Sequence, residues 1–242
     1  MSQNQILSMC LARFLGIILL LICLTANTLA VNNRPIHVST YLYQDATKEL
    51  TLPEIQKNDS IGLFERVNHI ENMGISREVS WIKIVVENAG KDSMDMILRW
   101  KEGLTHYVHF YEVGKDRIRE SISGLSVDDV QKEIISNAIC FPVSLNANSK
   151  HTYFLQIITP YNKEMNISVI DRKQLDKDER TYNIFAGAII FSVLVISLYN
   201  LFLGISLKDR LYFHFVAANI TDTFASTTMF GLLPTVFPFI PC

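Results

Sequence analysis

The chain has 242 residues, of which 19% are charged and 49% hydrophobic, and its formal net charge is −2. This near-neutral balance excludes a generally basic nucleic-acid binder, so no nucleic-acid partner is expected. Nearly all charged residues lie between positions 32 and 180, whereas both ends of the chain are apolar. The composition therefore predicts a polar body with apolar terminal segments.

Residues 1–30 are predicted to be a secretory signal peptide. Arg13 precedes an apolar run at 14–24, and Thr28-Leu29-Ala30 supplies small residues for cleavage. The run is too short to cross ~30 Å of hydrocarbon, which needs ~20 residues. An uncleaved anchor helix is the alternative, and the bulky residue before Cys23 disfavours a lipoprotein anchor. In each case the residues that follow are exported.

The exported body, residues 31–172, is predicted to be an extracytoplasmic sensor domain without a disulfide. Cys140 is alone in it, because Cys10 and Cys23 belong to the signal segment and Cys242 is the last residue. A domain of this length is large enough to be stabilised by its own hydrophobic core.

The dominant polarity period in this body is two, which is typical of β-strands. The clearest runs of β-branched and aromatic residues are 81–88, 94–100, 105–111 and 152–158. Turn-forming stretches rich in Gly, Asn and Asp separate them. The spacing predicts a mostly β ectodomain, an antiparallel jelly-roll-like β-sandwich, followed by transmembrane helices. Trp81 is assigned to the core, a helical turn capped by Thr51 is expected at 52–56, and 127–136 stays ambiguous.

The C-terminal third is predicted to enter the membrane. Residues 173–183 carry mixed charges and are interpreted as a solvated linker or a helix start. Residues 184–206 form an uncharged run long enough to span a bilayer. Because the signal peptide exports the sandwich, the loop at 207–210 is expected in the cytoplasm. A second transmembrane helix at 211–233 then leads to an extracytoplasmic tail at 234–242, whose prolines cannot continue a helix.

The second predicted span contains polar residues, among them Asp222. A charge at the bilayer centre costs ~2.5–3.5 kcal/mol on insertion scales. Asp222 is therefore either a functional intramembrane carboxylate or a side chain that faces a helix bundle, where an Asn or Ser contacts it.

The best candidates for ligand binding are aromatic, because sugar rings stack on exposed aromatic faces. The candidate residues are Trp100, Tyr107, His109 and Tyr111, with His106 nearby. If Val108 and Phe110 face the core, the side chains of Tyr107, His109 and Tyr111 face the other way. The alternative is that these aromatic residues complete the core of a second sheet.

The sequence contains no catalytic motif, and neither a cofactor nor a metal is predicted. His106 and His109 are three residues apart, which on a strand places them on opposite faces and not as a metal-binding pair. No Gly-rich phosphate loop, HExxH or GxSxG motif is present. Asp128 and Asp129 are adjacent and are interpreted as a solvated turn.

Several short segments occur in the order of a known family. They are residues 43–45, 50–52, 74–81, 81–88, 108–111, 123–124, 141–143, 153–156, 197–203 and 208–212. In this order the sequence resembles the bacterial seven-transmembrane receptors with diverse intracellular signalling modules. The ectodomain is similar to the second extracellular domain type of that family.

The resemblance implies a periplasmic sensor domain held at the bacterial inner (plasma) membrane, which binds a carbohydrate or another small molecule. In such receptors seven helices transmit the signal to a cytoplasmic output domain. This chain ends after two of them, so we expect a fragment, a truncated product or a split receptor, whose partner is a second copy or the missing part. The alternative is a membrane-anchored carbohydrate-binding or adhesion module without a signalling role.

Overall fold

The computed structural model describes residues 35–229, except 69, 76–77, 103–104, 115–116 and 161. The predicted signal peptide at 1–30 and the predicted tail at 234–242 lie outside the described residues.

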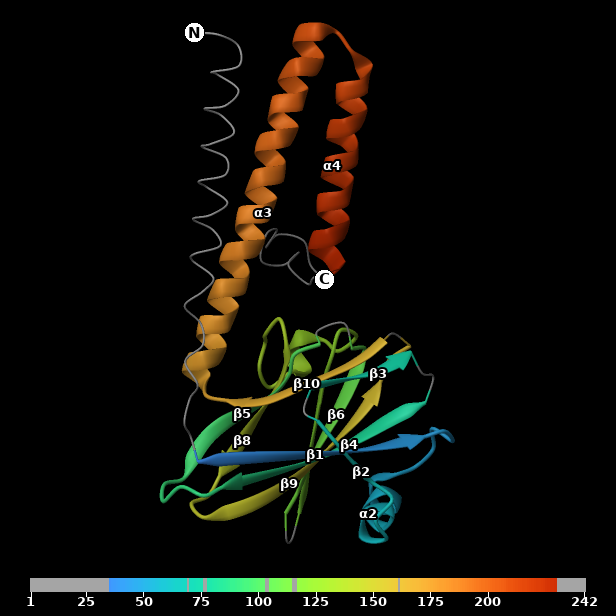
Figure 1. Ribbon diagram of the computed structural model, residues 1–242, viewed down its shortest axis with the longest axis vertical. Helices are drawn as coiled ribbons and strands as arrows, with labels where there is room; N and C mark the ends of the chain where they lie inside the picture. The colour runs from blue at the N-terminus through green and yellow to red at the C-terminus, as the bar shows by residue number, and fades with distance from the viewer. Residues whose placement is uncertain are drawn as a thin grey trace. The chain divides into compact units, whose positions relative to one another are not determined.

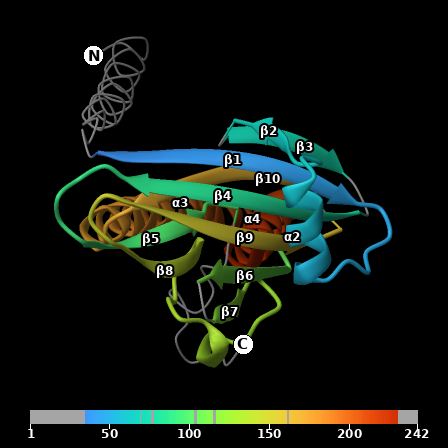
Figure 2. The ribbon, with the colours of Figure 1, turned by 90° about the horizontal axis from the view of Figure 1, so that it is seen from below.

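Two antiparallel β-sheets form the ectodomain (Figure 1). Their strands are β1 (Ile36–Asp45), β2 (Glu65–Val67), β3 (Ile70–Ile75), β4 (Val79–Asn88), β5 (Met94–Trp100), β6 (Tyr107–Val113), β7 (Ile118–Ser123), β8 (Ile139–Leu145), β9 (Ser149–Ile158) and β10 (Asn162–Ile170). One sheet has the order β2-β1-β4-β9-β6-β7, and the other has the order β3-β10-β5-β8. Figure 2 shows β1, β4, β9 and β6 side by side. The predicted antiparallel sandwich is confirmed.

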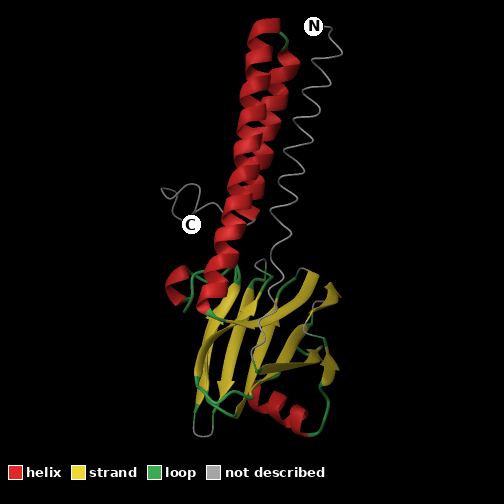
Figure 3. Ribbon diagram, turned by 60° about the vertical axis from the view of Figure 1, so that its left-hand side comes forward, coloured by secondary structure: helices red, strands yellow, loops and turns green. Residues whose placement is uncertain are grey.

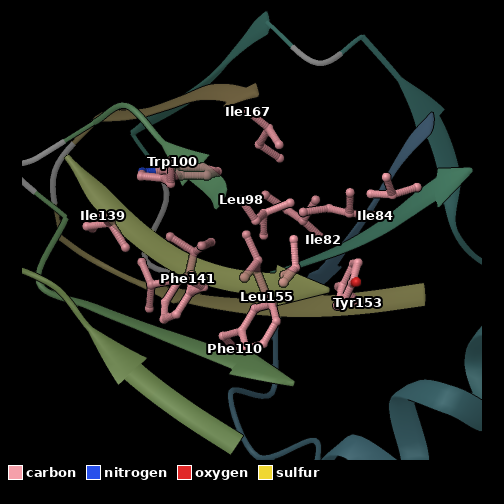
Figure 4. Close-up of a cluster of buried hydrophobic side chains, with 14 of the residues drawn as sticks. Ile82, Ile84, Leu98, Trp100, Phe110, Ile139, Phe141, Tyr153, Leu155 and Ile167 are labelled. Carbon is pink, nitrogen blue, oxygen red and sulfur yellow. The ribbon is translucent and has the colours of Figure 1, made fainter. Parts of the chain in front are cut away.

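The main core lies between the two sheets and follows from the period of two. On β4, Ile82, Ile84 and Val86 face inward and are fully buried. Phe110 of β6 stacks on Phe141 of β8 with ring centroids 4.8 Å apart, which joins the two sheets (Figure 4). Each buried aliphatic or aromatic side chain of this kind contributes about 1.5–3 kcal/mol relative to an exposed one.

A second hydrophobic cluster lies on the opposite face of the six-stranded sheet, beneath helix α2 (Leu52–Ser60). Leu52 and Ile55 pack there against Trp81 and Phe154. Trp81 is buried, as predicted, but in this cluster and not between the sheets. The helical turn expected at 52–56 extends to Ser60, and the Glu54 carboxylate accepts a hydrogen bond from the Thr51 N–H at 2.7 Å.

A single residue, Asp171, separates β10 from helix α3 (Arg172–Leu207). Residues 173–183, interpreted from the sequence as a solvated linker or a helix start, are therefore the start of a helix. They are also not fully solvated, because Leu175 is buried against Ile97 and Cys140 of the sandwich. Arg99 Nη1 donates to Asp178 Oδ2 at 2.6 Å and forms a second attachment.

Helix α4 (Arg210–Met229) follows α3 after the turn at Lys208 and Asp209 (Figure 3). Lys208 ends α3 with a φ of 55°, in the left-handed region. In the described part of the chain, α3 alone is both long and apolar enough to cross a membrane. The second span stays a prediction, and residues 230–233 of it lie outside the described residues.

The segment between β7 and β8, residues 124–138, is called the β7–β8 loop below. The ambiguous stretch at 127–136 contains a single 3-10 turn, Asp129–Gln131. Lys132 Nζ lies 2.7 Å from Asp129 Oδ1, and Arg119 of β7 forms an ion pair with Glu133. The first ion pair lies within the loop, and the second holds the loop against the sandwich.

Candidate functional site

The outer face of β6 presents the aromatic residues that the alternation predicted. Val108 and Phe110 are fully buried in the core, whereas Tyr107 is 38% exposed on the other face. His109 and Tyr111 lie on the same face as Tyr107 and are half-buried. The expectation that these three side chains point away from the main core is therefore correct.

Trp100 does not belong to this surface. It is 1% exposed in the core between the sheets, where its Nε1 donates to Thr105 Oγ1 at 3.0 Å (Figure 4). Met96, Leu98 and Trp100 occupy alternate positions of β5 and are all buried. The alternation of side chains along β5 therefore directs Trp100 inward. The prediction that Trp100 belongs to the exposed aromatic residues is wrong.

Tyr111 is held mainly by packing. Its ring stacks on Trp81 at 5.8 Å and on His109 at 6.4 Å. Burial, together with the neighbouring Glu120 carboxylate, raises the pKa of the Tyr111 hydroxyl to about 12. The same carboxylate lies 3.4 Å from His109 Nδ1. Packing and the neighbouring carboxylate thus hold Tyr111 and His109 in place beside the more exposed Tyr107.

A hollow of about 340 Å³ lies next to Tyr107. It is lined by Lys48, Glu78, Val79, His106, Tyr107, Ile158, Thr159 and Pro160. Ile158 pairs with Tyr107 across β9 and β6 and is 37% exposed. The hollow therefore combines an aromatic and an aliphatic side chain with charged groups at its rim. Sequence reasoning missed all these residues except Tyr107 and the neighbouring His106, because they come from separate parts of the chain.

The buried carboxylate of Asp45 positions the rim residue Lys48. Asp45 Oδ1 accepts hydrogen bonds from the N–H groups of Thr47 at 2.9 Å and Lys48 at 3.1 Å, and Oδ2 accepts one from Leu50 N at 3.1 Å. These bonds hold Lys48 at a φ of 63°. Burial opposes ionisation of Asp45, but the hydrogen bonds from Thr47, Leu50 and Lys48 outweigh it and lower its pKa.

This lowered pKa predicts an acid-dependent loss of stability. The contribution of Asp45 is present above its ordinary pKa of 3.8 and is lost as the pH falls through the lower folded-state value. We expect Asp45→Asn to reduce the free energy of unfolding at neutral pH and to flatten its decline below pH 3.8. Urea denaturation at several pH values measures this. Asp128→Asn, at an exposed position, should leave the profile unchanged, and parallel profiles for wild type and Asp45→Asn would contradict the assignment.

The remaining predicted groups can be placed as follows. Asp222 lies on α4 with an exposed side chain, and its role within a membrane stays a prediction. Within the described residues, no group of three or more His, Cys, Asp or Glu side chains is arranged to hold a metal ion. A polar hollow of about 400 Å³ at the turns after β4 and before β9 is lined by residues 87–89 and 148–150 and offers no aromatic surface.

Comparison with protein families identifies a match. The family described as 7TMR-DISM extracellular 2 matches residues 38–171, which is more than half of the chain and includes both sheets. No curated protein matches the sequence. The matched range ends at Asp171, the residue immediately before helix α3. The chain therefore belongs to the 7TMR-DISM extracellular 2 family, and it is a membrane protein whose β-sandwich is the extracellular domain of a seven-transmembrane receptor type.

Proposed function

We propose that this chain is the ligand-sensing part of a bacterial signalling receptor in the inner membrane, with the sandwich in the periplasm. Its ligand is a carbohydrate or another small molecule, bound at the hollow beside Tyr107. The observation that carries the proposal is the exposed Tyr107 ring, which stands next to Ile158 with Lys48 and Glu78 at the rim.

The composition of the hollow suits a small polar ligand with an apolar face. Small-molecule sites combine apolar and aromatic walls with a few polar groups, in volumes of about 300–1,000 Å³. The hollow, at about 340 Å³, lies at the lower end of this range. A sugar ring offers C–H groups to an aromatic face and hydroxyls to charged side chains.

The junction between sandwich and helix favours a sensor over an anchored adhesion module. An adhesion module needs only a tether, whereas a sensor must pass a change in the domain to the membrane. Leu175 buried against Ile97, and the ion pair between Arg99 and Asp178, attach α3 directly to the four-stranded sheet. The exposed apolar surfaces of α3 and α4 support contacts with lipid, with a second copy or with the remainder of a split receptor.

The site is tested by removing the exposed ring. The full chain in lipid nanodiscs is screened against soluble mono- and oligosaccharides and a small-metabolite library, and affinities for the hits are measured by calorimetry. Tyr107→Ala is expected to weaken binding at least about tenfold, or 1.4 kcal/mol, through lost stacking.

Tyr41→Ala is the matched control, because Tyr41 lies on the same face of the six-stranded sheet, on β1, outside the hollow. It should retain the affinity. An unchanged affinity in Tyr107→Ala would place the ligand elsewhere. Tyr111 is unsuitable for this test, because its stacking on Trp81 makes its removal a folding defect.

A further inference from the structure

The β7–β8 loop exposes large apolar side chains although the sandwich has well-filled cores. Val130 is 97% exposed, Ile135 68% and Leu125 49%. Each such side chain would gain about 25 cal/mol for every Å² of apolar surface removed from water. Isolated exposed residues of this kind are ordinary, so the position of the loop decides whether they have a partner.

The loop is attached to α3 immediately before its apolar run. Ile134 and Ala138 of the loop pack against the cluster that contains Leu175. Farther along the helix, Asn137 Nδ2 donates to Asn183 Oδ1 at 3.3 Å. The residue after Asn183 is Ile184, where an uncharged stretch begins that extends to Leu207.

Through Asn183, this attachment sets the depth of Asn137 relative to a bilayer that α3 spans. The hydrocarbon core begins near Ile184, and the headgroup layer outside it is about 5–8 Å thick. At a helical rise of about 1.5 Å per residue, the headgroup layer takes in Arg180, Tyr182 and Asn183. Tyr is enriched in this layer, and an Arg near the end of a membrane helix extends its charge into it. Asn137, hydrogen-bonded to Asn183, lies at the same level.

We infer that the β7–β8 loop rests on the bilayer and inserts Val130 and Ile135 into its interfacial region. Three of the four charged side chains of the loop are paired, Lys132 with Asp129 inside the loop and Glu133 with Arg119 of β7, whereas Asp128 is exposed. Because its only cation is paired within the protein, the loop is not an anionic-lipid receptor. Its partner is the apolar boundary of any fluid bilayer, including one of zwitterionic lipid. The inference rests on α3 as a membrane span and is independent of the ligand site.

The test places a fluorescent probe on the loop of the full chain. Cys10, Cys23 and Cys242 are replaced by Ser, and Cys140 is kept, because it is 1% exposed and burial raises its thiol pKa to about 11. Ile135→Cys carries an environment-sensitive dye in phosphatidylcholine vesicles that contain nitroxide-labelled lipid. Ile61→Cys, at an Ile exposed to 63% after α2, is the matched control.

The expected result is blue-shifted emission at position 135, strong quenching by the lipid nitroxide and weak quenching by aqueous iodide. The dye at position 61 should show the opposite pattern. Val130→Cys replaces a side chain that is 97% exposed, and it provides a second probe if the first variant folds poorly. Equal quenching patterns at 135 and 61 would overturn the inference. Protection of the dye from iodide without quenching by the lipid nitroxide would also overturn it, because protein and not lipid would then shield the dye.

Discussion

Gly124→Ala is expected to lower the free energy of unfolding by about 3–5 kcal/mol, because strain and a steric clash add. Gly124 has a φ of 145°, which side-chain-bearing residues rarely adopt. A Cβ there would lie 2.2 Å from the carbonyl oxygen of His106. The chain cannot move away freely, because the N–H groups of Leu125 and Ser126 donate to the carbonyls of Thr105 and His106. Urea denaturation followed by circular dichroism measures the loss.

Gly62→Ala separates the two causes. Gly62 also has a positive φ, 80°, but a Cβ there would meet no atom within 4 Å. Backbone strain alone costs about 1–2 kcal/mol. The Gly62 variant should therefore lose clearly less stability than the Gly124 variant, and equal losses would refute the steric explanation.

Leu175→Ala is expected to release the first turns of α3 from the sandwich. Leu175 is 1% exposed, and truncation of a buried leucine costs about 2–5 kcal/mol. Cys140 lies in the same cluster and is the reporter, since a thiol reagent reaches it only when this contact opens. The labelling rate of Cys140 should rise by about two orders of magnitude, because each 1.4 kcal/mol is worth about tenfold in the opening equilibrium. Mass spectrometry of the full chain in nanodiscs, with the other cysteines replaced by Ser, follows the reaction.

The matched control is Leu198→Ala, the same truncation on the same helix at a side chain that is 65% exposed. Its labelling rate should equal that of the parent protein. If both variants label at the parent rate, Leu175 does not hold the helix to the sandwich.

The period of two predicted the central strands well, but it could not tell which element covers each face. The runs at 81–88, 94–100 and 152–158 correspond to β4, β5 and β9. Trp81 and Trp100 have similar surroundings in the sequence, yet Trp81 lies under α2 and Trp100 lies between the sheets. Which face a second sheet or a helix covers depends on contacts between distant segments, and a local pattern does not encode them.

The sequence did not reveal the buried contact of Leu175 or the hollow beside Tyr107, for related reasons. At 173–183, charged residues surround Leu175, and one buried leucine among many polar residues produces no amphipathic period. The hollow beside Tyr107 draws Lys48, Val79 and Ile158 from three separate segments. The aromatic alternation on β6 revealed Tyr107 but none of the residues that surround it.

The single residue between β10 and α3 restricts how the sandwich can turn at the membrane. Asp171 has two soft backbone dihedral angles, and its side chain accepts a hydrogen bond from Gln174 N at 2.7 Å, which fixes the start of the helix. A flexible linker would let the domain tumble and present its sites in every direction. Here the domain reorients only together with the helix, so the hollow keeps one orientation relative to the axis of α3.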